Sequence, residues 1–408
     1  MERVLSLDLY ASAGVGVVAL LLGLFFTRKI PFLKRFCIPA PVSGGLLISL
    51  LTLLLHSLLG IECVFDGTVK DLCMMLFFTS VGFQSDLKVI RRGGRPLLLM
   101  IALVAVLITA QNLISMGIAR GLRLNPLFGM AAGSIPMSGG HGTSGGFSPL
   151  LEELGLAGAS SITMAAATFG LVAGSLLGGP LGEALIRRHH LSQPSADADV
   201  MSGTETTESR EKGSGTEAKA YQNYLQGACV LIIAMALGSG LSKLLALTGI
   251  TFPTYFGALL AACALRNLFG LSPKWEKELC LGGLVSIGDI CLQLFLGMAM
   301  ASLRLWELAS LALPLLLILL AQVSFMALYA AFVAFPLLGK TYDNAVLVSG
   351  LCGFGLGATP NAMANMSAVC YKYHYAAAPF IIVPILGAMF VDLINTGVVT
   401  LFLNLISP

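Results

Sequence analysis

Long uncharged runs alternate along the chain with short clusters of charged residues. Ten of these runs are apolar enough to be interpreted as membrane-spanning helices, for which about 20 consecutive apolar residues suffice. The runs are Leu9–Thr27, Ile38–Ile61, Leu72–Ser85, Pro96–Ala119 and Leu154–Gly182, then Tyr221–Ser242, Leu244–Leu265, Leu279–Leu303 (interrupted by Asp289), Leu308–Gly339 and Tyr373 to the end. The pattern predicts five spans in each half of an all-α polytopic membrane protein.

Two further uncharged windows, Leu124–Leu151 and Asn344–Tyr371, are too rich in Gly and Pro for plain spanning helices. Irregular backbone at membrane depth is tolerated where it is buried in protein or lines a cavity. We therefore predict a re-entrant or broken-helix segment near residues 126–150 and another near 344–368. Two such segments at matching positions of two halves are typical of the binding site of a secondary transporter.

A polar stretch, Arg187–Gln222, separates the halves and is rich in Ser, Thr, Glu and Gly without an apolar period. We interpret residues 187–222 as a disordered linker between an N-terminal repeat, 1–186, and a C-terminal repeat, 223–408. Most Lys and Arg residues fall on one side if both termini lie outside, which makes the linker cytoplasmic. Arg120, Arg123 and Arg304 are exceptions.

This charge pattern gives the two halves opposite orientations, and short sequence echoes support an inverted repeat. DLCMMLFF from Asp71 resembles DICLQLFL from Asp289, and PVSGGLL from Pro41 resembles PTYFGALL from Pro253. Asp71 precedes Gly140 by 69 residues, and Asp289 precedes Gly357 by 68. We read Asp71 and Asp289 most simply as helix N-caps, with Gly288 able to break the helix beside Asp289.

Composition agrees with a membrane protein and argues against other classes. The chain is 56% hydrophobic and 11% charged, which leaves too few charges to cover a soluble protein of 408 residues. The nine cysteines form no C-x-x-C pair, so neither a disulfide framework nor a metal centre is indicated. No nucleophile–base set lies at membrane depth, so we expect no enzyme and no cofactor. The net charge of +3 indicates no nucleic-acid partner.

The Gly-rich segments carry the candidate chemistry. Half-helix N-termini offer partly positive amides to anions, unwound carbonyls suit Na⁺, and Gly lets the backbone approach a ligand closely. The alternative is that these glycines only permit tight helix packing. The predicted substrate-binding residues are Ser138, Gly139, Gly140, His141, Gly142, Thr143, Gly355, Gly357, Ala358, Thr359, Asn361 and Asn365.

His141 is the one ionisable residue of the first window. It is a candidate to bind a carboxylate when protonated, to relay a proton, or to donate a hydrogen bond as neutral imidazole, which we favour because a buried cation is costly. Asp392 and Asn395 share a face of the last span and are candidate Na⁺ ligands, as is Asp289; an inter-helix hydrogen bond is the alternative for the first two. Gln111 and Asn112 are expected to pack against Gln322.

Four motifs together resemble the bacterial glutamate:sodium symporter family, and the similarity spares only the linker. They are SGGHGT from Ser138, GFGLGATP from Gly353 with the residues that follow it, LRLWELASLALP from Leu303, and FMALYA from Phe325. The resemblance implies Na⁺-coupled uptake of L-glutamate across the bacterial inner membrane. It also implies a homodimer of two inverted five-span domains with elevator-type movement.

Alternatives to this function remain. A carrier of another amino acid or of a di- or hydroxycarboxylate shares the architecture, although a more highly charged substrate is expected to bring Arg into the site. A channel with Gly-rich carbonyls as its filter is less favoured, because channels usually repeat their pore elements around an axis.

Overall fold

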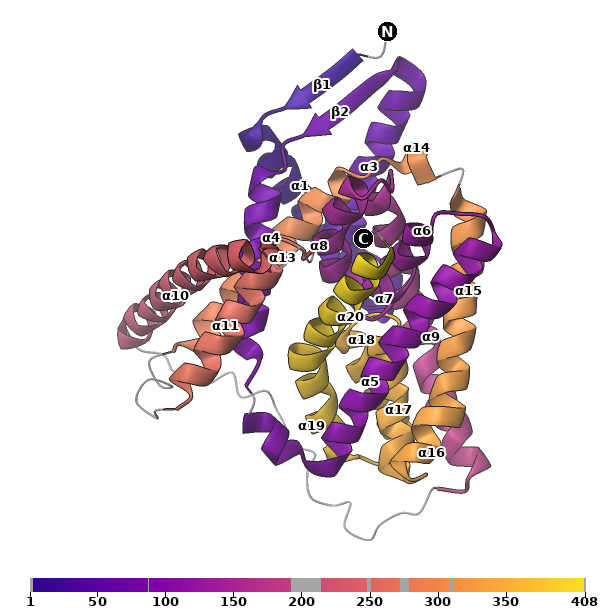
Figure 1. The fold of residues 1–408 in the computed structure, drawn as a ribbon. Coiled ribbons are helices and arrows are strands. Elements are labelled where there is room, and N and C mark those ends of the chain that lie inside the picture. The colour runs from indigo at the N-terminus through magenta and orange to yellow at the C-terminus, as the bar shows by residue number, and fades with distance from the viewer. Residues whose placement is uncertain are drawn as a thin grey trace.

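The computed structural model describes residues 3–86, 88–191, 214–247, 251–271, 279–308 and 311–406, and most of these residues are helical. Two strands, β1 (Arg3–Leu7) and β2 (Ile61–Phe65), pair in parallel at one end of the molecule, with Arg3 opposite Ile61. The helices form two bundles that lie side by side (Figure 1).

The first bundle contains the opening helices of both halves of the chain, which pack against one another. Its helices are α1 (Leu9–Lys29), α2 (Pro31–Arg35), α3 (Ala40–Leu59), α4 (Thr68–Gln84), α10 (Ser214–Ala246), α11 (Phe256–Phe269) and α13 (Leu281–Ala301). In Figure 1, α10 and α11 form its outer edge. We call this group the first bundle.

The second bundle contains the later helices of each half, including both Gly-rich windows. From the first half it takes α5 (Lys88–Gly121), α6 (Pro126–Ala131), α7 (Ser134–Met137), α8 (Gly140–Glu153) and α9 (Ala159–Arg188). From the second half it takes α15 (Ala312–Tyr329), the π-helical η2 (Ala330–Ala334), α16 (Phe335–Leu338), α17 (Tyr342–Gly355), α18 (Thr359–Lys372), α19 (Ala377–Ile385), the π-helical η3 (Leu386–Phe390) and α20 (Val391–Ile406). The short α14 (Leu305–Leu308) contacts α3 of the first bundle and α9 of the second.

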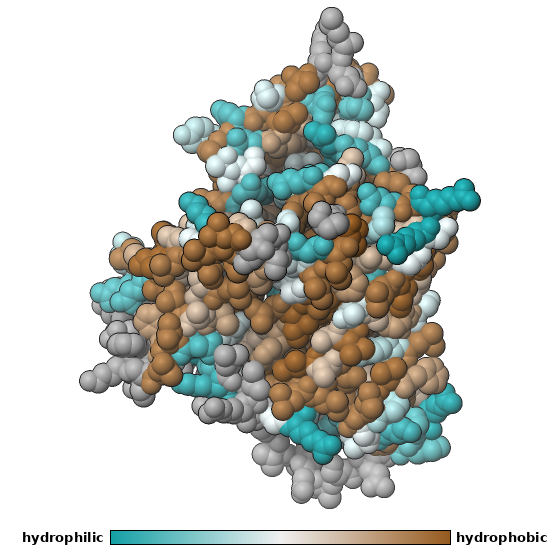
Figure 2. Space-filling model, in the orientation of Figure 1, coloured by the Kyte–Doolittle hydropathy of each residue, from teal (hydrophilic) through white to brown (hydrophobic). Residues whose placement is uncertain are grey.

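A polytopic membrane protein is the class that these helices support. Within the described residues, seven helices are long and apolar enough to cross a bilayer: 9–29, 40–59, 94–121, 159–188, 221–246, 281–301 and 312–338. Figure 2 shows hydrophobic side chains over the middle of the molecule and hydrophilic ones gathered toward its upper and lower ends.

The other three predicted spans correspond to helices that are shorter than any of these seven. α4 has 17 residues and α11 has 14, while the last run is divided by η3 into α19 and α20. α19, η3 and α20 follow one another without a gap from Ala377 to Ile406, and the π-helical turn changes the hydrogen-bond register between them.

The first bundle is packed reciprocally between the halves of the chain. α4 and α13, which carry the two copies of the echo at Asp71 and Asp289, contact each other; α3 packs on α13, and α11 packs on α4. Small residues permit these close approaches. A Cβ on Gly82 of α4 would lie 2.3 Å from the carbonyl oxygen of Leu259 in α11, and one on Gly45 of α3 would lie 2.4 Å from Cβ of Met300 in α13.

Three predictions about local structure are wrong. The caps of α4 and α13 are Gly67 and Cys280, so Asp71 lies in a first turn and Asp289 in the middle of a helix. α13 also runs unbroken through Gly288. A glycine is needed there for packing, because a Cβ would lie 1.9 Å from Ser80 Oγ of α4.

The ends of the predicted linker are helical: α9 continues to Arg188 and α10 begins at Ser214. Residues 192–213, the rest of the predicted linker, lie outside the described residues.

Arg304, an exception to the charge pattern, forms ion pairs with two carboxylates. Its guanidinium lies 3.0 Å from a carboxylate oxygen of Glu62 in β2 and 3.5 Å from one of Glu307 in α14. At the opposite connection between bundles, Arg266 donates a 2.9 Å hydrogen bond to Asp86.

Candidate functional site

A cavity of about 260 Å³ lies between the two bundles, at the point where the Gly-rich windows meet. The second bundle lines it with Ser138, Gly139, Gly140, His141, Gly142, Thr143, Leu171, Phe354, Gly357, Ala358, Thr359, Pro360, Gly387, Val391 and Asp392. The first bundle, with the loop that leads into α3, lines it with Cys37, Pro39, Phe77, Leu292 and Leu296. Its volume is just below the roughly 300–1,000 Å³ usual for drug-sized ligands, which suits a small metabolite.

The first wall of the cavity is a turn between two helices of the first Gly-rich window. α7 ends at Met137, Ser138 and Gly139 follow, and α8 begins at Gly140. Gly140 has φ +60, a left-handed conformation that favours glycine. We call residues 138–143 the first tip; the opening amides of α8 have no partner within that helix.

The second wall is the corresponding turn of the second window. α17 ends at Gly355, and α18 begins at Thr359 with Pro360 in its first turn, a position where the missing N–H of Pro costs nothing. We call residues 355–359 the second tip. The tips meet backbone to backbone, because a Cβ on Gly140 would lie 2.9 Å from the carbonyl oxygen of Gly357.

Gln111 on α5 joins the two tips from behind. Its Nε2 donates to the Gly355 carbonyl at 2.8 Å, and its Oε1 accepts from Ser138 Oγ at 2.7 Å. Gln111 is fully buried, and its own backbone carbonyl accepts from Gln322 Nε2 at 2.7 Å. The predicted contact between Gln111 and Gln322 is confirmed, whereas the link from Gln111 to both tips was not foreseen.

A second buried hydrogen-bond network joins α5, α7 and α20 next to the first tip. Asn112 Nδ2 donates to Ser134 Oγ at 2.8 Å, and Ser134 Oγ donates to Asn395 Oδ1 at 2.6 Å. Asn395 Nδ2 donates back to the Ser134 carbonyl at 3.1 Å. Both functional atoms of Asn395 are therefore engaged by α7, one turn along α20 from Asp392.

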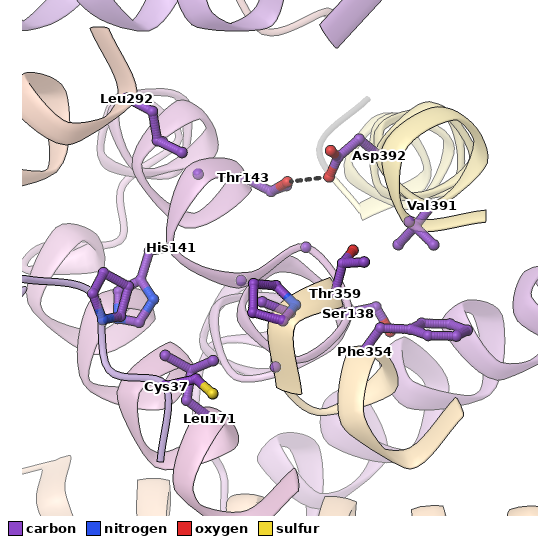
Figure 3. Close-up of a pocket in the computed structure, with 18 of the residues that line it drawn as sticks. Cys37, Ser138, His141, Thr143, Leu171, Leu292, Phe354, Thr359, Val391 and Asp392 are labelled. Atoms are coloured by element: carbon purple, nitrogen blue, oxygen red, sulfur yellow. Dashed lines mark hydrogen bonds between the residues drawn. The ribbon is translucent and has the colours of Figure 1, made fainter. Parts of the chain in front are cut away.

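Asp392 is the acidic residue of the cavity wall. Figure 3 shows its carboxylate and the Thr143 hydroxyl pointing toward each other from α20 and α8. Thr143 Oγ1 donates to Asp392 Oδ1 at 3.3 Å. Within the described chain, none of the residues that line the cavity is Lys or Arg, so no permanently charged cation offsets the charge of Asp392 there.

His141 lies in the wall with 6% of its surface exposed, and its Nε2 is 3.0 Å from Thr168 Oγ1 on α9. The Thr168 hydroxyl has one hydrogen, which it donates to the Met164 carbonyl at 2.9 Å. The hydroxyl therefore accepts from His141, and Nε2 carries a proton. The contact with α9 engages Nε2 of His141 and does not engage Nδ1.

The structure brings most predicted substrate-binding residues to the cavity: those of the first tip, together with Gly357, Ala358 and Thr359. It places Gly355, Asn361 and Asn365 behind the wall. Asn361 Nδ2 donates to the Leu171 carbonyl at 2.8 Å and Asn365 Nδ2 to the Gly174 carbonyl at 2.9 Å, so both fasten α18 to α9.

Of the candidate Na⁺ ligands, Asp392 lines the cavity and Asn395 lies behind it, whereas Asp289 does not line the cavity and is exposed on α13. Within the described part of the chain, no three His, Cys, Asp or Glu residues gather as a metal centre. An ion bound here would therefore rely on hydroxyl, carbonyl or amide oxygens besides Asp392.

The packing interpretation of the glycines holds for several of them, including Gly145 and Gly146. A Cβ on Gly145 would lie 2.1 Å from the Phe295 ring, and one on Gly146 would lie 2.4 Å from the Tyr255 ring. Two aromatic side chains of the first bundle thus fit against α8 beyond the first tip. The first window thus combines binding-site geometry at its tip with helix packing beside the tip.

Comparison with known proteins gives one consistent result. A sequence model of the family described as "Sodium/glutamate symporter" matches residues 5–375. A protein named sodium/glutamate symporter from Escherichia coli (strain K12) is 40% identical over 403 residues, covering 98% of both chains. One of the same name from Haemophilus influenzae is 34% identical over 389 residues, covering 95% of both chains.

Proposed function

Because this chain belongs to the sodium/glutamate symporter family, we propose that it carries L-glutamate across the membrane together with Na⁺. The observation that carries the proposal is the cavity where both Gly-rich tips and Asp392 meet. It is a transporter and not an enzyme, and Na⁺ is its coupling ion.

We propose that the tips hold the carboxylates of glutamate. The opening amides of α8 and the Thr359 amide are donors in or beside the cavity wall, whereas the hydroxyls of Ser138 and Thr143 already donate to Gln111 and Asp392. Each helix end contributes up to ~2 kcal/mol toward an anion in partly buried geometry. Several donors are needed to offset the dehydration of two carboxylates, which is a reason for both tips to contribute to one site.

We propose that Na⁺ binds beside Asp392 with the help of Thr143 Oγ1. Asp392 is a negative charge in the wall of an anion site that has no Lys or Arg, so on its own it repels the substrate. A bound Na⁺ reverses that effect and adds attraction. Glutamate then binds well only after Na⁺, which is the thermodynamic coupling that symport requires.

The architecture that we propose for this function is an inverted repeat of two five-span units. The reciprocal packing of α3 on α13 and α11 on α4 supports it, as does the recurrence of a two-helix turn at each tip. In this arrangement α6–α8 and α17–α18 are re-entrant hairpins. The second bundle carries the site and moves like an elevator against the first.

We further propose a homodimer in the bacterial inner membrane, with both termini outside and the linker cytoplasmic. The N-terminus and the C-terminal end of α20 both lie toward the upper part of Figure 1, while α19 and α16 lie at the lower end. That arrangement agrees with an even number of crossings.

Calorimetric titration of L-glutamate into the purified protein, with and without Na⁺, tests the proposed site. We expect binding in NaCl and at least about tenfold weaker binding in an equal concentration of choline chloride, which corresponds to a coupling free energy of about 1.4 kcal/mol. Equal affinity in both salts would contradict the proposed order of binding.

A further inference from the structure

A second cavity, of about 370 Å³, lies between α1, α2, α3 and one residue of α9. Its walls are apolar apart from Ser43 and Thr168, whose hydroxyls are already bonded to the carbonyls of Ala40 and Met164. The cavity therefore offers no free polar group to a ligand and suits a hydrocarbon chain. We call it the lateral groove.

The lateral groove follows one face of α3. Val42, Leu46 and Leu50 line it at intervals of four residues, so they lie above one another on the helix and span about 12 Å along its axis. Leu46 is 38% exposed and Leu50 is 49% exposed, so the groove is open along its side.

Four cations are next in sequence to groove-lining residues, in the segment that connects α1 and α3. Arg28 and Lys29 end α1, directly before the lining residue Ile30, and Lys34 and Arg35 end α2, directly after the lining residue Leu33. All four are exposed, and no described acidic side chain forms an ion pair with any of them.

We propose that the lateral groove is a binding site for an anionic phospholipid, with an acyl chain along α3 and the phosphate among these four cations. Basic pockets beside membrane helices bind acidic headgroups in this way. A second copy of the chain is a poorer occupant, because a symmetric contact here would bring two sets of like charges together.

The lateral groove shares a wall with the substrate cavity. Thr168 lines the groove and contacts His141, which lines the substrate cavity; Ile38 lines the groove between Cys37 and Pro39, which both line the substrate cavity. A lipid in the groove supports this wall from behind. Its loss is therefore expected to raise the KM for glutamate, a consequence that rests on the proposed function, whereas lipid binding itself does not.

Native mass spectrometry of the purified full-length protein tests the site directly. The protein is exchanged into detergent, and phosphatidylglycerol or phosphatidylcholine is added in equal amounts. We expect retention of phosphatidylglycerol in preference to phosphatidylcholine. At about fivefold per cation, the double variant Lys34→Gln/Arg35→Gln is expected to weaken phosphatidylglycerol retention about 25-fold. Leu46→Trp, which fills the groove and keeps the charges, is expected to lose the same adduct.

The control is Arg120→Gln/Arg123→Gln, which removes two exposed cations at the far end of α5 and is expected to retain lipid like the unmodified protein. Equal retention of both lipids, or unchanged retention in both groove variants, would overturn the proposal. So would loss of dimers without any change of lipid adducts, since that would assign the groove to a second copy of the chain.

Discussion

Replacing Gln111 by Met tests whether the two tips act as one site. Met is close in length and shape to Gln but has neither amide donor nor carbonyl acceptor. The change removes the 2.8 Å bond to the Gly355 carbonyl and the 2.7 Å bond from Ser138. It alters no residue that lines the cavity, so any change in glutamate affinity must reach the site through the tips.

The magnitude follows from which groups lose a partner. Ser138 Oγ is also 3.4 Å from the Gly355 carbonyl, so the two groups left by Gln111 have each other as a weak alternative. We therefore expect the free-energy cost of one unsatisfied buried polar group, which is about 1–3 kcal/mol. If that cost is borne by the substrate-binding arrangement of the tips, the KM for glutamate rises about fivefold to roughly hundredfold.

The assay is initial-rate uptake of radiolabelled glutamate by proteoliposomes over a range of glutamate concentrations. Gln322→Met is the matched control: Gln322 donates to the backbone carbonyl of Gln111, so its loss removes a buried bond to the same residue without touching either tip. An unchanged KM in Gln111→Met, in protein that is folded and inserted, would show that Gln111 does not join the two tips into one site. An equal rise in both variants would show a general loss of packing.

Three further outcomes follow from the site and the topology. Gly140→Ala is expected to lower stability by about 1–2 kcal/mol, because residue 140 has a left-handed backbone, and to weaken glutamate binding further by separating the tips. The control is Gly179→Ala, whose Cβ meets open space. Equal glutamate affinities in the two variants would place Gly140 outside the site. Asp392→Asn is expected to raise the Na⁺ concentration for half-maximal uptake about tenfold or more, whereas Asp289→Asn should not; no change in Asp392→Asn would leave Asp392 as a packing residue. Protease added outside right-side-out vesicles should leave residues 187–222 intact, and cleavage there would reverse the proposed topology.

The order of the helices and the position of the tips were predictable from the sequence, because both depend on local signals. Uncharged runs indicate spans, and Gly and Pro inside such runs indicate broken helices whose ends need partners. Gly140 and Gly357 were identified on these grounds, and both line the cavity. The pair of echoes at Asp71 and Asp289 likewise led to two helices that pack together.

The opposite wall of the cavity was not predictable in the same way. Phe77, Leu292 and Leu296 resemble any other apolar residue of a spanning helix, and what distinguishes them is which helix face meets the second bundle. Pro39, which ends the break between α2 and α3, was the one sequence signal on this wall that could have indicated an irregular segment there. Asn361 and Asn365 were predicted to bind substrate, but both donate to backbone carbonyls of α9. A side-chain amide near a tip can bond to a neighbouring helix as readily as to a ligand, and the sequence does not distinguish the two.

The central claim is that an Na⁺ gradient drives glutamate transport. It is tested most directly by uptake of radiolabelled L-glutamate into proteoliposomes under an imposed inward Na⁺ gradient, at equal pH on both sides. We expect transient accumulation above the external concentration, and none when K⁺ replaces Na⁺. Accumulation driven by a pH gradient in the absence of Na⁺ would contradict the claim.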